Sequence, residues 1–399
     1  MLAHRANFAK LTAAIVVALG LSACAADIVR NGITSAELAD HAVVHDMRGI
    51  RYWGDEKPAD FMAELRRRLP NLPRLAQGST RINGRPVVET LALSGGGGDG
   101  AFGAGILTGW TERGDRPQFE VVTGVSAGAI IAPFAYLGPR YDRALKEIWT
   151  QYQTSQLVTA QILPGILGGS SLADTTPLEN LIAQYADKQL LREVAAEYRK
   201  GRLLFVLTTN LDAQRPVVWN LGEIAASGHP NALELFRKAI MASAAIPGAF
   251  PPVAFPVEVD GKKYDELHVD GGTTREVFVL PVNVPFKTYD RLYDKPPIRR
   301  LYIVKNGKIA PEQQVVNAKT LDIVSRSIST LIKNQNLGEL YRIHRMAQDA
   351  GADFNFIAVP VTFNVKSNQF FDPAYQSALF EEGRKMGAAG VPWKKTPPM

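Results

Sequence analysis

The fold of this chain is decided by the segment FEVVTGVSAGA, residues 119–129. Its start, residues 119–123, predicts a short buried strand, and the apolar residues that follow the turn, 127–137, predict a helix. Between them stands a GxSxG sequence, in which Gly124 and Gly128 permit the sharp turn that exposes the hydroxyl of Ser126. The first amides of the following helix point towards this serine and favour negative charge there. We therefore expect Ser126 to be a nucleophile.

The same alternation extends in both directions from this segment. Further strands are predicted at residues 87–94, 203–208, 300–304 and 355–360, and helices at 101–110, 231–243 and, as one long or two joined helices, 317–349. Strands that alternate with helices indicate an α/β fold whose sheet is covered on both faces. A length of 399 residues, 46% of them hydrophobic, is sufficient for one large core with extensions.

A glycine-rich segment, SGGGGDG at residues 94–100, follows the predicted strand at 87–94. Glycines leave backbone amides unobstructed, and such amides can stabilise an oxyanion. The candidates for these donors are Gly95, Gly96, Gly97 and Gly98.

The alternative is a dinucleotide site, since residues 98–103 also satisfy GxGxxG. A dinucleotide site requires an acidic residue at the end of the next strand, whereas Glu120 begins that strand. The sequence therefore favours the oxyanion loop.

A serine nucleophile requires a base, and both histidines and carboxylates follow Ser126 in the chain. His229 lies in a turn, and His344 lies in a predicted helix among arginines. His268 stands two residues before Asp270, so a strand would direct both side chains to one side. From the residues alone, a Ser-His-Asp arrangement and a direct serine–carboxylate pair both remain open.

Taken together, three motifs resemble the patatin-like phospholipase family. They are the glycine-rich loop, the GxSxG segment, and an Asp-Gly-Gly sequence formed by Asp270, Gly271 and Gly272. The segment ASAAIPGAFPP, residues 242–252, adds to this resemblance, which spans about residues 88–285. Gly100 completes the first motif. The resemblance implies a three-layer α/β/α patatin-like fold with a mainly parallel central sheet.

The resemblance also implies a reaction. Ser126 would attack an ester of a lipid or phospholipid, and Asp270 would accept its proton directly, without a histidine and without a cofactor. An ordinary aspartate is a weak base near neutral pH, so burial would have to raise its pKa. Apolar stretches at residues 162–167 and 246–255 are candidates for an acyl channel.

One position departs from the family pattern. The family commonly carries Arg or Lys where this chain has Asp99. An anion there would repel an oxyanion or a phosphate unless its side chain turns away. This departure motivates a competing hypothesis, a non-catalytic lipid-binding envelope protein that keeps the fold. No cluster of metal-ligating residues is apparent.

The first residues predict export and membrane attachment. Residues 1–23 resemble a secretory signal peptide, and the end of this segment resembles a lipobox that would lipidate Cys24, the only cysteine. The alternative is an ordinary secreted protein cleaved after Ala25. With lipidation, the chain would be an envelope lipoprotein, anchored in the outer membrane by analogy.

We expect residues 24–86 to lead from the anchor, residues 87–285 to form the catalytic domain, and residues 286–399 to be an extension packed on it. The net charge of +6 is spread along the chain, which argues against a nucleic-acid partner.

Overall fold

A computed structural model describes residues 30–56, 80–157, 159–160, 173–279, 286–369 and 371–398. The predicted signal peptide, Cys24 and the candidate channel stretch at 162–167 lie outside these residues. In the part of the chain that is described, no helix is long and apolar enough to cross a membrane.

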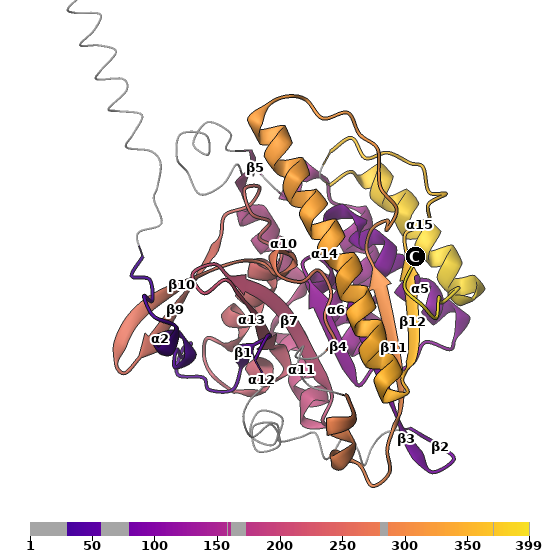
Figure 1. Ribbon diagram of the computed structural model, residues 1–399, viewed down its shortest axis with the longest axis horizontal. Helices are drawn as coiled ribbons and strands as arrows, with labels where there is room; N and C mark the ends of the chain where they lie inside the picture. The colour runs from indigo at the N-terminus through magenta and orange to yellow at the C-terminus, as the bar shows by residue number, and fades with distance from the viewer. Residues whose placement is uncertain are drawn as a thin grey trace, which may run out of the picture.

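Five parallel strands form the centre of one sheet (Figure 1). In spatial order they are β7 (Leu203–Asn210), β4 (Val121–Val125), β3 (Arg85–Leu93), β11 (Ile298–Lys305) and β12 (Asp353–Ala358). Two antiparallel strands extend the β7 side, first β8 (Arg215–Asn220) and then β1 (Arg51–Trp53). The predicted α/β fold with a mainly parallel central sheet is thus confirmed.

Side chains alternate between the two faces of this sheet, and each face is covered. On β11, Tyr302 and Val304 join the large core cluster, whereas Leu301 and Ile303 join a second cluster on the other face. The large cluster packs against α5 (Gly100–Arg113), α6 (Ala127–Leu137), α13 (Ala232–Ser243) and α15 (Pro373–Gly390). The second packs against α14 (Thr320–Ala350), which crosses the front of the sheet in Figure 1.

Shorter elements complete the described chain. The helices are α2 (Ala36–Asp40), α7 (Asp142–Thr150), α8 (Thr154–Leu157), α10 (Thr176–Tyr185), α11 (Lys188–Arg199) and α12 (Leu221–Ala226). The strands are β2 (Arg81–Ile82), β5 (Thr159–Ala160), β6 (Ala173–Asp174), β9 (Val253–Val259) and β10 (Lys262–Asp270). Four 3₁₀ helices are η2 (Gly97–Asp99), η3 (Pro139–Tyr141), η4 (Gly271–Thr273) and η5 (Phe286–Leu292).

Helices α5 and α15 pack with their backbones in contact, side by side in Figure 1. A Cβ atom on Gly105 would stand 2.1 Å from the carbonyl oxygen of Phe380. From the other side, a Cβ on Gly383 would stand 2.4 Å from the carbonyl oxygen of Phe102. Only glycine fits such an approach, so the last helix is held firmly against the helix that follows the glycine-rich loop.

Candidate active site

Two strands meet end to end along one edge of β7. β4 runs parallel to β7 and places Val125 opposite Leu207. β10 runs antiparallel to β7 and places Asp270 opposite Thr208, the next position. Because the two strands approach from opposite directions, their carboxyl ends converge. The residue after β4 is Ser126, so the topology of the sheet brings the nucleophile next to Asp270.

Ser126 lies on a strained turn. Its φ of 54° and ψ of −121° are unusual for a residue with a side chain. The turn closes tightly, since a Cβ on Gly124 would lie 2.3 Å from the carbonyl oxygen of Gly128. The amide of Ser126 donates to Ser243 Oγ over 3.0 Å, and that hydroxyl donates to the Leu207 carbonyl over 2.6 Å. The turn is therefore fastened to α13 and to β7.

Asp270 is buried and accepts a hydrogen bond from the Ser126 hydroxyl. Its Oδ1 also accepts one from the Gly272 amide over 2.7 Å. The pKa of Asp270 is raised from 3.8 to about 7, chiefly by burial and also by the charge of the nearby Glu276, while the two hydrogen bonds lower it. A carboxylate with this pKa can accept a proton near neutral pH. Gly271 is required next to it, because a Cβ there would stand 2.3 Å from the Leu207 carbonyl oxygen.

The glycine-rich loop lies against this pair. A Cβ on Gly95 would stand 3.1 Å from the Cβ of Ser126. Gly96 and Gly97 have φ values of 152° and 54°, which favour glycine. The amide of Gly95 donates to the Glu276 carbonyl over 3.0 Å and is occupied by that bond. The loop continues through η2, which contains Gly98, into α5.

Comparison with known proteins finds one family that this chain is similar to. Residues 91–283 match the family model described as patatin-like phospholipase. This segment is similar to patatin-like phospholipase domains. Lipid acyl hydrolysis is the activity that this family supports in general. No curated protein matches the chain.

Among solved structures, VipD from Legionella pneumophila is similar at 13% identity with a TM-score of 0.32. That similarity covers 76% of this chain and 66% of the VipD chain.

Asn306 fixes the glycine-rich loop from outside the segment that matches the family model. Its side-chain nitrogen donates to the Ser94 carbonyl over 2.8 Å, and its Oδ1 accepts from the Gly103 amide over 3.0 Å. One buried amide group thus bridges the residues on both sides of the loop. Its backbone contributes too, because a Cβ on Gly96 would lie 1.9 Å from the Asn306 carbonyl oxygen. No motif in the sequence indicated this residue.

Asp99 is turned towards the C-terminal helix. Its Oδ1 accepts a hydrogen bond of 2.6 Å from the Tyr375 hydroxyl on α15. Asp99 occupies the N-cap position of α5 but makes no side-chain capping bond. Burial raises the pKa of Asp99, and the charge of Lys305 lowers it. The anion that departs from the family pattern is therefore engaged by a tyrosine and faces a nearby ammonium group.

A buried ion pair joins Lys305 and Glu276 beside the loop. Lys305 is 5% exposed and Glu276 is 8% exposed, so the pair is nearly removed from solvent. The Lys305 ammonium and the Asp99 carboxylate both lie within 4 Å of the point where a Cβ on Gly307 would stand. A positive charge from the end of β11 thus stands near the position where the family commonly carries one.

The three histidines considered as bases make other contacts. In His268, Nδ1 is 2.8 Å from Thr208 Oγ1 and Nε2 is 3.0 Å from Glu266 Oε2, inside a fully buried network. His344 packs its ring edge-on against Phe354. His229 stacks on His45. No cluster of three or more potential metal ligands is found in the described segments.

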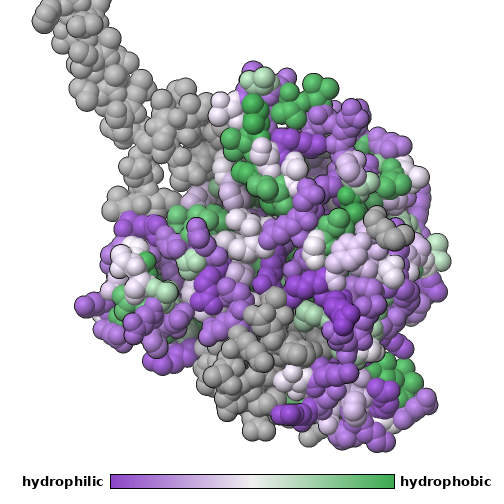
Figure 2. Space-filling model, viewed as in Figure 1, coloured by the Kyte–Doolittle hydropathy of each residue, from purple (hydrophilic) through white to green (hydrophobic). Residues whose placement is uncertain are grey.

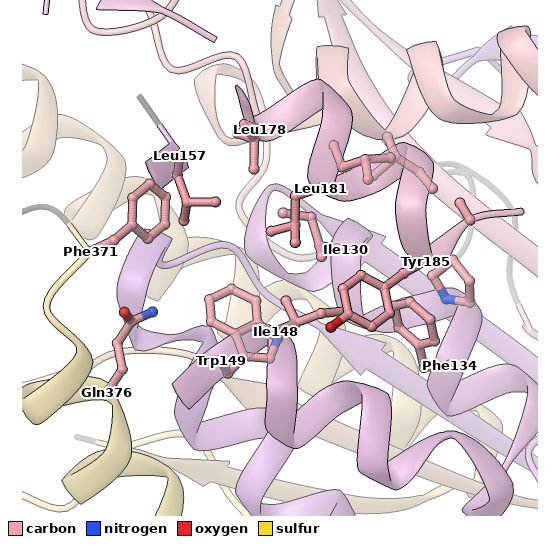
Figure 3. A pocket seen from close by; sticks show the side chains of 14 residues that line it. Ile130, Phe134, Ile148, Trp149, Leu157, Leu178, Leu181, Tyr185, Phe371 and Gln376 are labelled. Carbon is pink, nitrogen blue, oxygen red and sulfur yellow. The ribbon is translucent and has the colours of Figure 1, made fainter. Parts of the chain in front are cut away.

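An apolar cavity lies among α6, α7, α10 and α15 (Figure 3), and the empty space of about 550 Å³ there includes open solvent. Ile130, whose amide donates to the Ser126 carbonyl over 3.3 Å, lines it one turn along α6. Trp149 lines it as well and also packs against Gly100, where a Cβ would stand 2.2 Å from the indole ring. The cavity wall therefore touches both the serine turn and the glycine-rich segment. The candidate channel stretch at 246–255 contributes none of its lining residues.

Proposed function

We propose that this protein hydrolyses carboxylic esters of lipids, as a phospholipase A or lysophospholipase, through a Ser126–Asp270 dyad. The observation that carries the proposal is the convergence of β4 and β10 on β7, which gives a hydrogen bond from the serine hydroxyl to a carboxylate. The pKa of about 7 at Asp270 supports its role as the base.

In the first half of the reaction, Ser126 Oγ forms a bond to the ester carbonyl carbon while Asp270 takes the hydroxyl proton. The tetrahedral oxyanion is held by loop amides, for which Gly96, Gly97 and Gly98 are the candidates because the Gly95 amide is occupied. Collapse breaks the bond to the alcohol oxygen, and Asp270 returns the proton to that oxygen. The product alcohol leaves, and the acyl group stays on Ser126.

In the second half, Asp270 takes a proton from water, whose oxygen attacks the acyl-enzyme carbonyl. The bond to Ser126 Oγ then breaks, the serine regains the proton, and the fatty acid is released. The apolar cavity that begins at Ile130 is where we place the acyl chain.

The test compares a short-chain nitrophenyl ester and a phospholipid as substrates for wild type, Ser126→Ala and Asp270→Asn. Both variants should lose more than about a thousandfold in kcat/KM if the two groups act as a unit. His268→Gln is the matched control, since it alters a buried polar residue two positions away, and it should retain activity. Activity that survives in Ser126→Ala, in a folded protein, would refute the mechanism.

We also propose that Cys24 is lipidated after removal of residues 1–23 and anchors the enzyme in the cell envelope. The sequence motif alone supports this. Metabolic labelling with a fatty-acid analogue should mark the wild type and leave Cys24→Ala unmarked. Equal labelling of both proteins would rule out this site of lipidation.

A further inference from the structure

Large apolar side chains are exposed along one edge of the molecule. They lie on the loop that follows β11, on the first turns of α14 and on the loop that follows β12. We call them the apolar rim: Val315, Val316, Ile323, Val324, Leu331, Val361 and Val365. Val315 is 94% exposed, Leu331 71% and Val361 66%. Figure 2 shows hydrophobic side chains gathered at the top of the molecule, where α14 begins. Clustered exposed apolar residues mark an interaction site.

The apolar rim stands at the same edge of the sheet as the catalytic pair. In parallel strands the carboxyl ends share an edge, and the loops after β3, β4, β11 and β12 all leave from it. The loops after β11 and β12 are adjacent, since the Val359 amide donates to the Gly307 carbonyl over 3.2 Å. The rim therefore borders the loops that carry Ser126 and the glycine-rich segment.

One face of α14 connects the rim to the site. Val324, Ile328, Leu331 and Gln335 recur at helical spacing and so share that face. Gln335 donates to the carbonyl of Thr274, which closely follows Asp270 and its two glycines. The apolar residues continue this line, turn by turn, away from the site. On α14, Asn336 is the first buried residue among those whose side chains are described, so the preceding turns stand clear of the core.

Charge on these segments favours a phosphate-bearing surface. Lys319 and Lys366 are exposed among the rim residues. The carboxylate of Glu312 lies between two lysines, with Lys333 Nζ at 3.4 Å and Lys308 Nζ at 3.8 Å, so its charge is largely compensated. Apolar side chains interspersed with lysines suit the boundary between acyl chains and headgroups of a lipid bilayer.

We propose that the apolar rim is the surface by which this protein docks on a lipid bilayer, with the catalytic edge of the sheet facing the lipid. The proposal rests on the function proposed above, since a lipid substrate in a bilayer must reach Ser126 from this edge. Docking by the rim would bring the esters of the outermost lipids to the loops around the dyad. The first turns of α14 would enter the headgroup region.

The experiment measures vesicle binding separately from chemistry. Full-length proteins all carrying Cys24→Ala, so that no acyl anchor contributes, are sedimented with phosphatidylcholine vesicles that contain phosphatidylglycerol. Ser126→Ala is included to prevent hydrolysis during binding. The Val324→Ser/Leu331→Ser double variant should bind the vesicles at least about tenfold more weakly than its parent, because two exposed apolar anchors are removed. Hydrolysis of a soluble short-chain ester is measured on the same proteins with Ser126 intact, and there the double variant should stay within about twofold of the Cys24→Ala parent.

Ile82→Ser is the matched control. Ile82 is also exposed, at 37%, but β2 pairs with the start of β3 and so lies at the opposite edge. Its vesicle binding should be unchanged. Either retained vesicle binding in the double variant or an equal loss of binding in Ile82→Ser would overturn the docking surface. Retained binding in the double variant would instead favour a protein partner for the rim. Absence of soluble-ester hydrolysis in the Cys24→Ala parent with Ser126 intact would instead refute the proposed function, while the sedimentation result would still decide the rim.

Discussion

Replacing Asp270 by asparagine is expected to stabilise the protein above neutral pH while it abolishes hydrolysis. The pKa of this carboxyl rises from 3.8 to about 7 on folding because the group is buried. The folded protein therefore holds a proton that the unfolded chain releases as pH rises from 3.8 to 7. Stability associated with this group is complete below pH 3.8 and is lost as pH rises through 7. The difference in pKa corresponds to about 4 kcal/mol.

Asparagine has nearly the same shape as aspartate and stays neutral, so the Asp270→Asn protein does not lose this stability as pH rises. Unfolding by urea, followed by circular dichroism at pH 5 and pH 8, measures the effect. The free energy of unfolding of Asp270→Asn should exceed that of wild type by about 3 kcal/mol more at pH 8 than at pH 5. Ser126→Ala, which keeps the carboxyl, should retain the wild-type pH dependence apart from the lost hydrogen bond. A gain in Asp270→Asn that is equal at both pH values would refute the reasoning.

Three further outcomes are expected. Glu276→Gln removes a negative charge that raises the pKa of Asp270, so the rising limb of kcat/KM should move to lower pH; an unmoved limb would contradict this coupling. Asn306→Asp loses the donor to the Ser94 carbonyl, so kcat for a soluble ester should fall about tenfold or more while KM stays nearly constant. An unchanged kcat would show that the loop needs no such bridge. Ile130→Trp narrows the cavity, so steady-state rates on long-chain esters should fall more than those on short-chain esters; equal losses would place the acyl chain elsewhere.

The sequence was most informative where structure is local. The helix predicted at residues 127–137 agrees with α6, and the predicted strand at 300–304 lies within β11. The strand predicted at 119–123 is displaced by two residues, since β4 spans Val121–Val125. The Glu120 side chain accepts a hydrogen bond of 2.6 Å from the Glu89 amide. A side chain that bonds to a neighbouring strand leaves no mark in hydrophobic periodicity.

The parts of the candidate site that could not be predicted depend on contacts distant in the chain. Asn306 and Tyr375 reach the glycine-rich loop from β11 and α15, and neither belongs to a motif. The effect of Asp99 could not be judged without Tyr375, since its direction depends on that partner. For His268, the sequence predicted a side chain on the same side as Asp270. Only the fold shows that its Nδ1 contacts Thr208 and its Nε2 contacts Glu266.

The contact between α5 and α15 makes the glycine-rich loop depend on a segment distant from it in the chain. α15 is the last helix among the described residues, and Tyr375 at its start contacts Asp99 beside the glycine-rich loop. A chain that ends before residue 373 lacks this support, although it already contains Ser126 and Asp270. Non-local contacts of this kind form late in folding. Loss of α15 would therefore leave the glycine-rich loop without its tyrosine contact while both residues of the proposed dyad remain in place.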